Sequence, residues 1–313
     1  MFHSAFFWRA SRRALSAGAC CLALLGATLS GAQTGKSGNQ YTNGMEGIDG
    51  ASIPPAGVYL RWYNLYYDAD TEKDAAGKAE NLNFQAGVFA TVPRMIWVTP
   101  KKFLGGDVTL AALVPITYQD VKIGAASIHQ HAAHIGDVDA TTLLAWHGKR
   151  YDLAAGSDWI LPSGAWDATS VVKPGGDEFT IMPDLGGVYY FDQKHVYDLS
   201  VLSRFEYHTD KRHQDIHMGD DMHFEWGAAR ALKTPGVKVG AAGYAQWKVT
   251  DDTGKDVTWT GTAHDRVFAA GPELVMPLPH SHYLMQMRGE VEFGARSRTA
   301  GEVLNLTFVR KMM

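Results

Sequence analysis

Charged and polar side chains recur at every second position along several stretches of this chain. In MQMRGEVEF, residues 285–293, a glutamine, an arginine and two glutamates alternate with apolar residues and a glycine. Side chains at alternate positions of a β-strand share one face, so these polar groups lie together. In a confined polar interior, such charges form either a structural ion-pair network or a selectivity-determining constriction. The residues that we predict to line this interior are Arg61, Asp139, Asp152, Asp158, Asp184, Arg204, Glu206, Glu225, Gln246, Lys248, Glu273, Gln286, Arg288, Glu290 and Glu292.

The same alternation recurs along most of the chain, whereas amphipathic helices are hard to find. Frequent β-branched and aromatic residues, 33 glycines and regularly spaced turn clusters indicate an all-β protein. Twelve strand segments are predicted, at residues 57–67, 83–98, 107–118, 136–147, 150–161, 179–191, 196–207, 221–232, 237–249, 265–276, 282–294 and 302–310.

The connections between these segments alternate in length. Those after the even-numbered segments are mostly tight, such as 192–195 and 233–236. Outer-membrane β-barrels have short periplasmic turns, longer extracellular loops and an even number of antiparallel strands. We therefore predict a transmembrane antiparallel barrel of about 12 strands. The connections predicted to be long are 68–82, 119–135, 162–178, 208–220, 250–264 and 295–301.

The strand number also sets the expected size of the interior. Eight strands fill with side chains and 16 to 18 leave an aqueous channel, so twelve should leave a narrow or nearly closed pore. Aromatic residues near strand ends suit the girdles of a membrane barrel. Those expected in girdles are Tyr59, Trp62, Tyr66, Trp97, Trp146, Trp159, Tyr189 and Trp247.

The N-terminus has a different composition. Three arginines precede an apolar run and a Ser-Gly-Ala stretch, which predicts a secretory signal peptide over residues 1–32. Residues 33–56, rich in glycine, asparagine and serine, are either a periplasmic lead or a segment that plugs the lumen. Residues 57–313 form the predicted barrel, in the outer membrane of a Gram-negative bacterium.

Charge and cysteine content exclude several classes of function. Three of the 29 basic residues and none of the 33 acidic residues lie in the predicted signal, so the remainder carries 26 against 33, or −7. Such a balance predicts no nucleic-acid partner. Both cysteines, Cys20 and Cys21, also lie in the signal, which leaves no disulfide framework and no thiolate site.

Histidines raise the question of a metal. His129, His131 and His134 fall in one predicted loop and are weak candidate ligands, because imidazole binds zinc, copper or nickel. No carboxylate or thiolate pattern sharpens the motif, so we predict no cofactor. A second group, around another predicted loop, contains His208, His213, His217 and His223.

A set of short turn motifs follows in a fixed order: EG at 46–47, PPAG at 54–57, GD at 136–137, LPSG at 161–164, DDTG at 251–254 and GPE at 271–273. Together with the stretches around them, these motifs resemble the outer-membrane proteins grouped as "MetA-pathway of phenol degradation", including members labelled SphA-like. The resemblance covers nearly the whole predicted mature chain. It implies a barrel that passes small hydrophobic or aromatic compounds, and it brings no catalytic residues.

The predicted function is therefore an outer-membrane channel for small solutes, not an enzyme. Its expected partners are the lipid bilayer, a small-molecule solute and the outer-membrane assembly machinery. Two alternatives are a barrel enzyme of the acyl hydrolase type and a structural or adhesive surface barrel. The hydrolase would use Ser203 and His208, although no G-x-S-x-G elbow is present.

Overall fold

The computed structural model describes residues 38–313. The predicted signal peptide and residues 33–37 lie outside the described residues. No helix within residues 38–313 is both long and apolar enough to cross a membrane. The strands are β1 (Gly57–Lys73), β2 (Phe84–Phe103), β3 (Gly106–Leu113), β4 (Ile116–Ile123), β5 (Ile128–Ile135), β6 (Val138–His147), β7 (Tyr151–Leu161), β8 (Thr180–Tyr190), β9 (Tyr197–His208), β10 (Asp221–Ala231), β11 (Lys238–Lys248), β12 (Arg266–Pro277), β13 (Tyr283–Arg296) and β14 (Arg298–Lys311).

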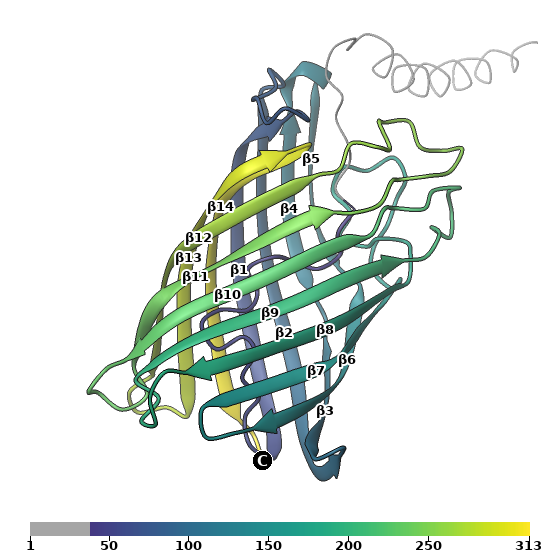
Figure 1. Ribbon diagram of the computed structural model, residues 1–313. Coiled ribbons are helices and arrows are strands. Elements are labelled where there is room, and N and C mark those ends of the chain that lie inside the picture. Colours follow the sequence, from purple (N-terminus) through teal and green to yellow (C-terminus); the bar gives the residue numbers. More distant parts are fainter. Residues whose placement is uncertain (1–37) are drawn as a thin grey trace, which may run out of the picture.

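These strands form one closed antiparallel barrel (Figure 1). Strand β1 pairs with β14 on one side and with β2 on the other, so the sheet has no free edge at its closure. Both β3 and β4 pair with successive halves of β2, and β6 and β5 pair with β3 and β4 in turn. Strands β3 and β4 together therefore form one strand of the barrel wall, and β5 and β6 form the next. The 14 strands thus make a wall of twelve, and the predicted number is confirmed.

The break between β3 and β4 has a local cause in Pro115. Proline has no backbone N–H to give to a strand ladder. Its carbonyl oxygen instead accepts the N–H of Gly136 at 2.8 Å, at the matching break between β5 and β6. The two wall strands therefore stay in register across the interruption.

The two ends of the barrel differ in their connections. Short connections, such as 104–105 and 148–150, lie at one end, which we call the turn end. Connections 162–179, 209–220 and 249–265 lie at the opposite end, which we call the loop end.

Two predicted long loops are wrong. Residues 119–135 form the β4–β5 hairpin with the 3-10 turn Gly124–Ala126 at its tip, and the connection over 295–301 is reduced to Ser297.

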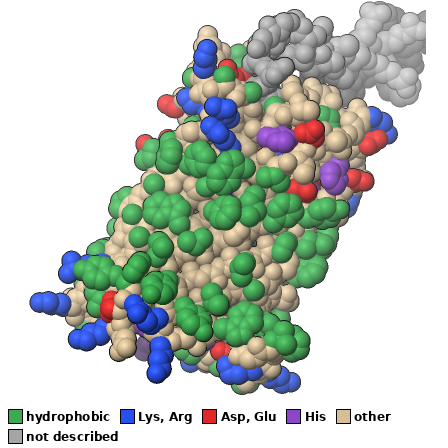
Figure 2. Space-filling model, viewed as in Figure 1, with side chains coloured by type: hydrophobic (Ala, Val, Ile, Leu, Met, Phe, Trp, Pro, Cys, Tyr) green, Lys and Arg blue, Asp and Glu red, His purple; other side chains and the backbone are tan. Residues whose placement is uncertain are grey.

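The two faces of the strands separate by polarity. In β13, Met287, Val291 and Phe293 are exposed, whereas the polar residues between them are buried. On the face that Figure 2 shows, apolar side chains form a band across the barrel, and charged side chains gather toward its two ends. This is the reverse of a soluble sandwich and suits a barrel in lipid. One girdle assignment is wrong, since Tyr59 is 7% exposed and donates its hydroxyl to Pro55 O at 2.7 Å.

Candidate functional site: the lumen and its N-terminal segment

A stretch of chain that precedes β1 occupies the interior of the barrel. We call residues 39–52 the luminal segment. Its residues Tyr41, Met45, Ile48 and Ala51 are buried. The segment begins beside Glu206 at the loop end and leads toward Gly57, where β1 starts at the turn end. It therefore crosses the space that a pore through this barrel would use.

Wall carboxylates hold this segment by its backbone. Glu206 accepts the N–H groups of Gln40, at 2.9 Å, and of Tyr41. Glu225 accepts those of Gly44 and Glu46, both at 2.9 Å. Glu273 accepts that of Ile48 at 3.0 Å. Buried backbone N–H groups need partners, and this segment, which has no regular secondary structure of its own, finds them on β9, β10 and β12.

Arg288 on β13 contacts the segment from the other side. It pairs with Glu273 at 3.2 Å and with Glu290 at 3.0 Å, and it also donates to the carbonyl oxygen of Gly44. Asn305 donates to the same carbonyl at 3.0 Å. The backbone is close here because Gly47 has no side chain. A Cβ at this position would lie 2.1 Å from the Nη1 atom of Arg288.

Glu46 is the charged centre of the luminal segment. Its carboxylate pairs with Arg61 at 2.8 Å and with Arg94 at 3.2 Å, lies 3.9 Å from Arg204, and accepts the Tyr63 hydroxyl at 3.0 Å. Three guanidinium groups around one buried carboxylate favour its ionised form. Glu46 is therefore ionised and anchors the segment to three strands.

Part of the lumen is apolar. Tyr41 and Met45 of the luminal segment pack with Tyr63, Ala90, Val92, Leu113 and Met182 of the wall. Tyr41 also places its hydroxyl between Arg204, at 3.1 Å, and Glu225, at 2.8 Å. The interior thus offers an apolar surface beside a dense set of charges.

All fifteen predicted lining residues lie on the inward faces of their strands. Thirteen are buried, and Arg61 and Asp184 are partly buried. Several of these residues contact one another. Arg61 donates a hydrogen bond to Gln286 at 3.1 Å, and Arg204 forms an ion pair with Asp158 at 3.8 Å. Lys248 pairs instead with Asp252, which follows its strand, at 2.8 Å.

Residues 69–308 match the profile of the family described as "Putative MetA-pathway of phenol degradation". The chain belongs to this family. The assignment drawn from the turn motifs is thereby confirmed. No curated protein matches the chain significantly.

Several solved structures of outer-membrane proteins are similar to this chain. The COG4313 outer membrane channel from Pseudomonas putida F1 is similar with a TM-score of 0.72 and 13% identity, over 86% of this chain and 99% of that chain. The translocator domain of autotransporter NalP from Neisseria meningitidis has a TM-score of 0.48 and 10% identity, over 96% and 98% of the two chains. The NanC porin has a TM-score of 0.45 and 7% identity, over 81% and 100%. Family and fold together indicate an outer-membrane channel or porin-like barrel.

Two lumen residues of this family member escaped the sequence prediction. Glu46 enters that prediction only as part of a turn motif, and Arg94, whose strand face otherwise carries small and apolar residues such as Ala90 and Val92, does not enter it. A lone arginine within an apolar strand face is itself a signal, because burial of its charge requires a partner. Here the partners are Glu46 and the Thr141 hydroxyl, at 2.8 Å.

The histidine candidates separate by face. His129 and His131 lie on strand β5 and are exposed beside Asp120, whose carboxylate is 2.9 Å from His129 Nε2. His134 occupies the opposite face of that strand. The prediction that all three share a loop is therefore wrong.

The geometry also bears on the hydrolase alternative. Ser203 and His208 lie on opposite faces of β9, and His208 is fully buried on the inner face. A nucleophile and its base must lie within hydrogen-bond reach. Ser203 and His208 cannot form this hydrogen bond, because the barrel wall separates their side chains.

Proposed function

We propose that this protein is an outer-membrane channel for small, mainly hydrophobic or aromatic, uncharged solutes, and that the luminal segment controls their passage. The observation that carries the proposal is the set of five backbone N–H groups bound by three wall carboxylates, Glu206, Glu225 and Glu273. A segment held in this way closes the pore while it is seated. Because these five hydrogen bonds join the segment to side chains of the wall and not to its strand ladders, the segment can be released without unfolding the wall.

The solute class is supported by the family description and by the lining. The fifteen lining residues include nine acidic and four basic side chains, an excess that opposes the entry of anions. The apolar surface beside Tyr41 and Met45 suits an aromatic ring. An uncharged aromatic compound satisfies both conditions, whereas a carboxylate such as benzoate satisfies only one.

A reversible tether tests the control by the segment. A Cβ at Gly186 would lie 3.0 Å from the Ala51 Cβ and 2.7 Å from Leu202 Cδ1, so cysteines at positions 51 and 186 can form a disulfide once the leucine side chain and the segment shift slightly. We expect the oxidised Ala51→Cys, Gly186→Cys channel to conduct less in planar bilayers than the reduced one. The two single-cysteine variants are the controls. Equal conductance in both redox states would refute the control by the segment.

Current block tests the solute class on the same bilayers. Phenol, benzoate and glucose are added in turn to the reduced channel. We expect phenol to interrupt the ion current most often and benzoate least often. If glucose or benzoate gives the most frequent block, the channel serves another class of solute.

A further inference from the structure

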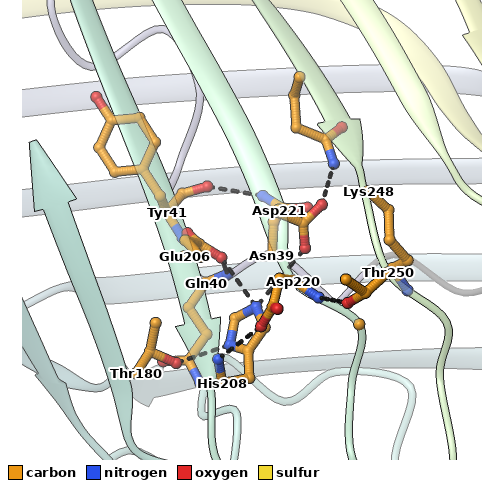
Figure 3. A network of polar contacts seen from close by, with 12 residues as sticks. Asn39, Gln40, Tyr41, Thr180, Glu206, His208, Asp220, Asp221, Lys248 and Thr250 are labelled. Atoms are coloured by element: carbon orange, nitrogen blue, oxygen red, sulfur yellow. Dashed lines mark hydrogen bonds and ion pairs between the residues drawn. The ribbon is translucent and has the colours of Figure 1, made fainter.

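Three side chains converge in the wall at the loop end, where β9 ends and β10 begins. Glu206 and His208 come from β9 and Asp221 from β10, and all three are fully buried. Their ligand atoms lie within 4.8 Å of one another. Figure 3 shows the two carboxylates facing the same imidazole, with Thr180 on its far side.

The distances within this cluster are those between ligands of a metal ion. His208 Nε2 lies 3.3 Å from Glu206 Oε2 and 3.6 Å from Asp221 Oδ2. Bonds of about 2.0–2.1 Å in tetrahedral geometry place neighbouring ligand atoms about 3.3–3.4 Å apart. A protonated imidazole would instead be expected to donate a bond of about 2.7–2.9 Å to a carboxylate.

Two buried polar atoms of the cluster also indicate a bound cation. Among residues 38–313, neither His208 Nε2 nor Asp221 Oδ2 has a hydrogen-bond partner, although both are buried. Such atoms are costly to leave without a partner. A cation between them would satisfy both and would offset the charges of the two carboxylates.

Neighbouring groups already hold His208 and Asp221 in a ligating orientation. The His208 Nδ1 atom lies 2.8 Å from the Thr180 hydroxyl, which can accept its proton and leave the Nε2 lone pair free. Gln246 donates to Asp221 Oδ1, so the other oxygen faces His208. Ligating histidines usually have such a partner on the second ring nitrogen.

We propose that Glu206, His208 and Asp221 bind a divalent transition metal such as Zn²⁺. One imidazole nitrogen with two carboxylate oxygens favours Zn²⁺ or a similar ion over Ca²⁺ or Mg²⁺, which take oxygen ligands. Glu206 also accepts the N–H groups of Gln40 and Tyr41. Since each carboxylate oxygen has two lone pairs, metal and luminal segment can bind it together. The bound metal fixes the carboxylate that holds this segment, a consequence that rests on the proposed function.

Metal binding is tested on the full-length protein, purified from membranes in detergent without a histidine tag. After treatment with EDTA, Zn²⁺ is titrated by calorimetry and Co²⁺ by its visible absorption, which reports the geometry. We expect one equivalent to bind to the wild type. His208→Ala and Asp221→Asn should weaken binding at least about tenfold, since even partners of ligands contribute 10–100-fold.

His264→Ala is the matched control. His264 is exposed and pairs with Asp251 within the connection between β11 and β12, outside the proposed metal site. This variant should bind as the wild type does. Heat-modifiable mobility on gels confirms that each variant is folded, and Asp221→Asn keeps an oxygen for Gln246. The metal site would be overturned if the wild type bound no stoichiometric metal. It would also be overturned if His208→Ala and Asp221→Asn bound the metal as tightly as the wild type.

Conductance tests the link to the luminal segment separately. Zn²⁺ should lower the open probability of the wild type and leave that of His208→Ala unchanged. Stoichiometric binding with no effect on conductance would overturn only this link. The redox tether, which does not involve the metal, would still report on the proposed function.

Discussion

The carboxylate of Glu225 on β10 accepts the backbone N–H of Glu46 at 2.9 Å, so that a wall residue holds the peptide inside the lumen. The same carboxylate accepts the Gly44 N–H and the Tyr41 hydroxyl. Side chains of the wall thus bind the backbone of the segment at several points.

Replacement of Glu225 should release the luminal segment. Glu225→Ala removes three hydrogen bonds to a charged acceptor, each worth about 1.5–3 kcal/mol. We expect a higher open probability in planar bilayers, with a smaller increase for Glu225→Gln, which keeps one acceptor oxygen. Glu302→Ala, at an exposed position of β14, is the control. Unchanged gating in Glu225→Ala would contradict the role of this anchor.

A methyl group at Gly47 should displace the segment while the sequence of the wall stays unchanged. The new Cβ would lie 2.1 Å from the Nη1 atom of Arg288 and 2.2 Å from a Glu273 oxygen, so either these side-chain ends or the segment must shift, and the ion pair between the two side chains favours a shift of the segment. Gly47→Ala should raise conductance while the barrel keeps its heat-modifiable mobility. Gly289→Ala, whose Cβ would meet nothing within 4 Å, should behave as the wild type. Equal effects of the two changes would argue against close packing at Gly47.

Loss of Arg288 should destabilise the barrel. Arg288→Met leaves Glu273 and Glu290 buried without their guanidinium partner, and breaking a buried pair costs about 3–5 kcal/mol. The midpoint of urea unfolding, followed by gel mobility, should fall. Arg230→Met, on the outer face, should change the midpoint much less. A comparable fall in both variants would mean that the Arg288 pairs are not the cause.

A charge on the outer face should cost more than a charge inside. Leu306→Arg places a guanidinium against lipid and should cost about 2–4 kcal/mol if it lies near the middle of the bilayer. Gln286→Glu places a charge inward, beside Arg61, and should cost little. The measurements are folding yield in lipid and fractionation with the outer membrane. If the inward change proves the more damaging, the two faces are assigned wrongly.

The sequence by itself determined the faces, the number of strands and the family. Period-two alternation is a local property of an extended chain, so Arg288, Glu290 and Met287 could be assigned to their faces without any knowledge of the fold. Alternating connection lengths then selected a membrane barrel, in which the polar face is the inner one. The fifteen lining residues were assigned to the inward face in this way.

Tertiary structure decided how the interior is filled. The luminal segment is held largely through backbone N–H groups, which every residue except proline carries, so its sequence could not distinguish a plug from a loose lead. The approach of His208 to Asp221 depends on the pairing of β9 with β10 around a 12-residue connection. Such contacts arise from strand register and barrel closure, which bring together groups distant in the sequence.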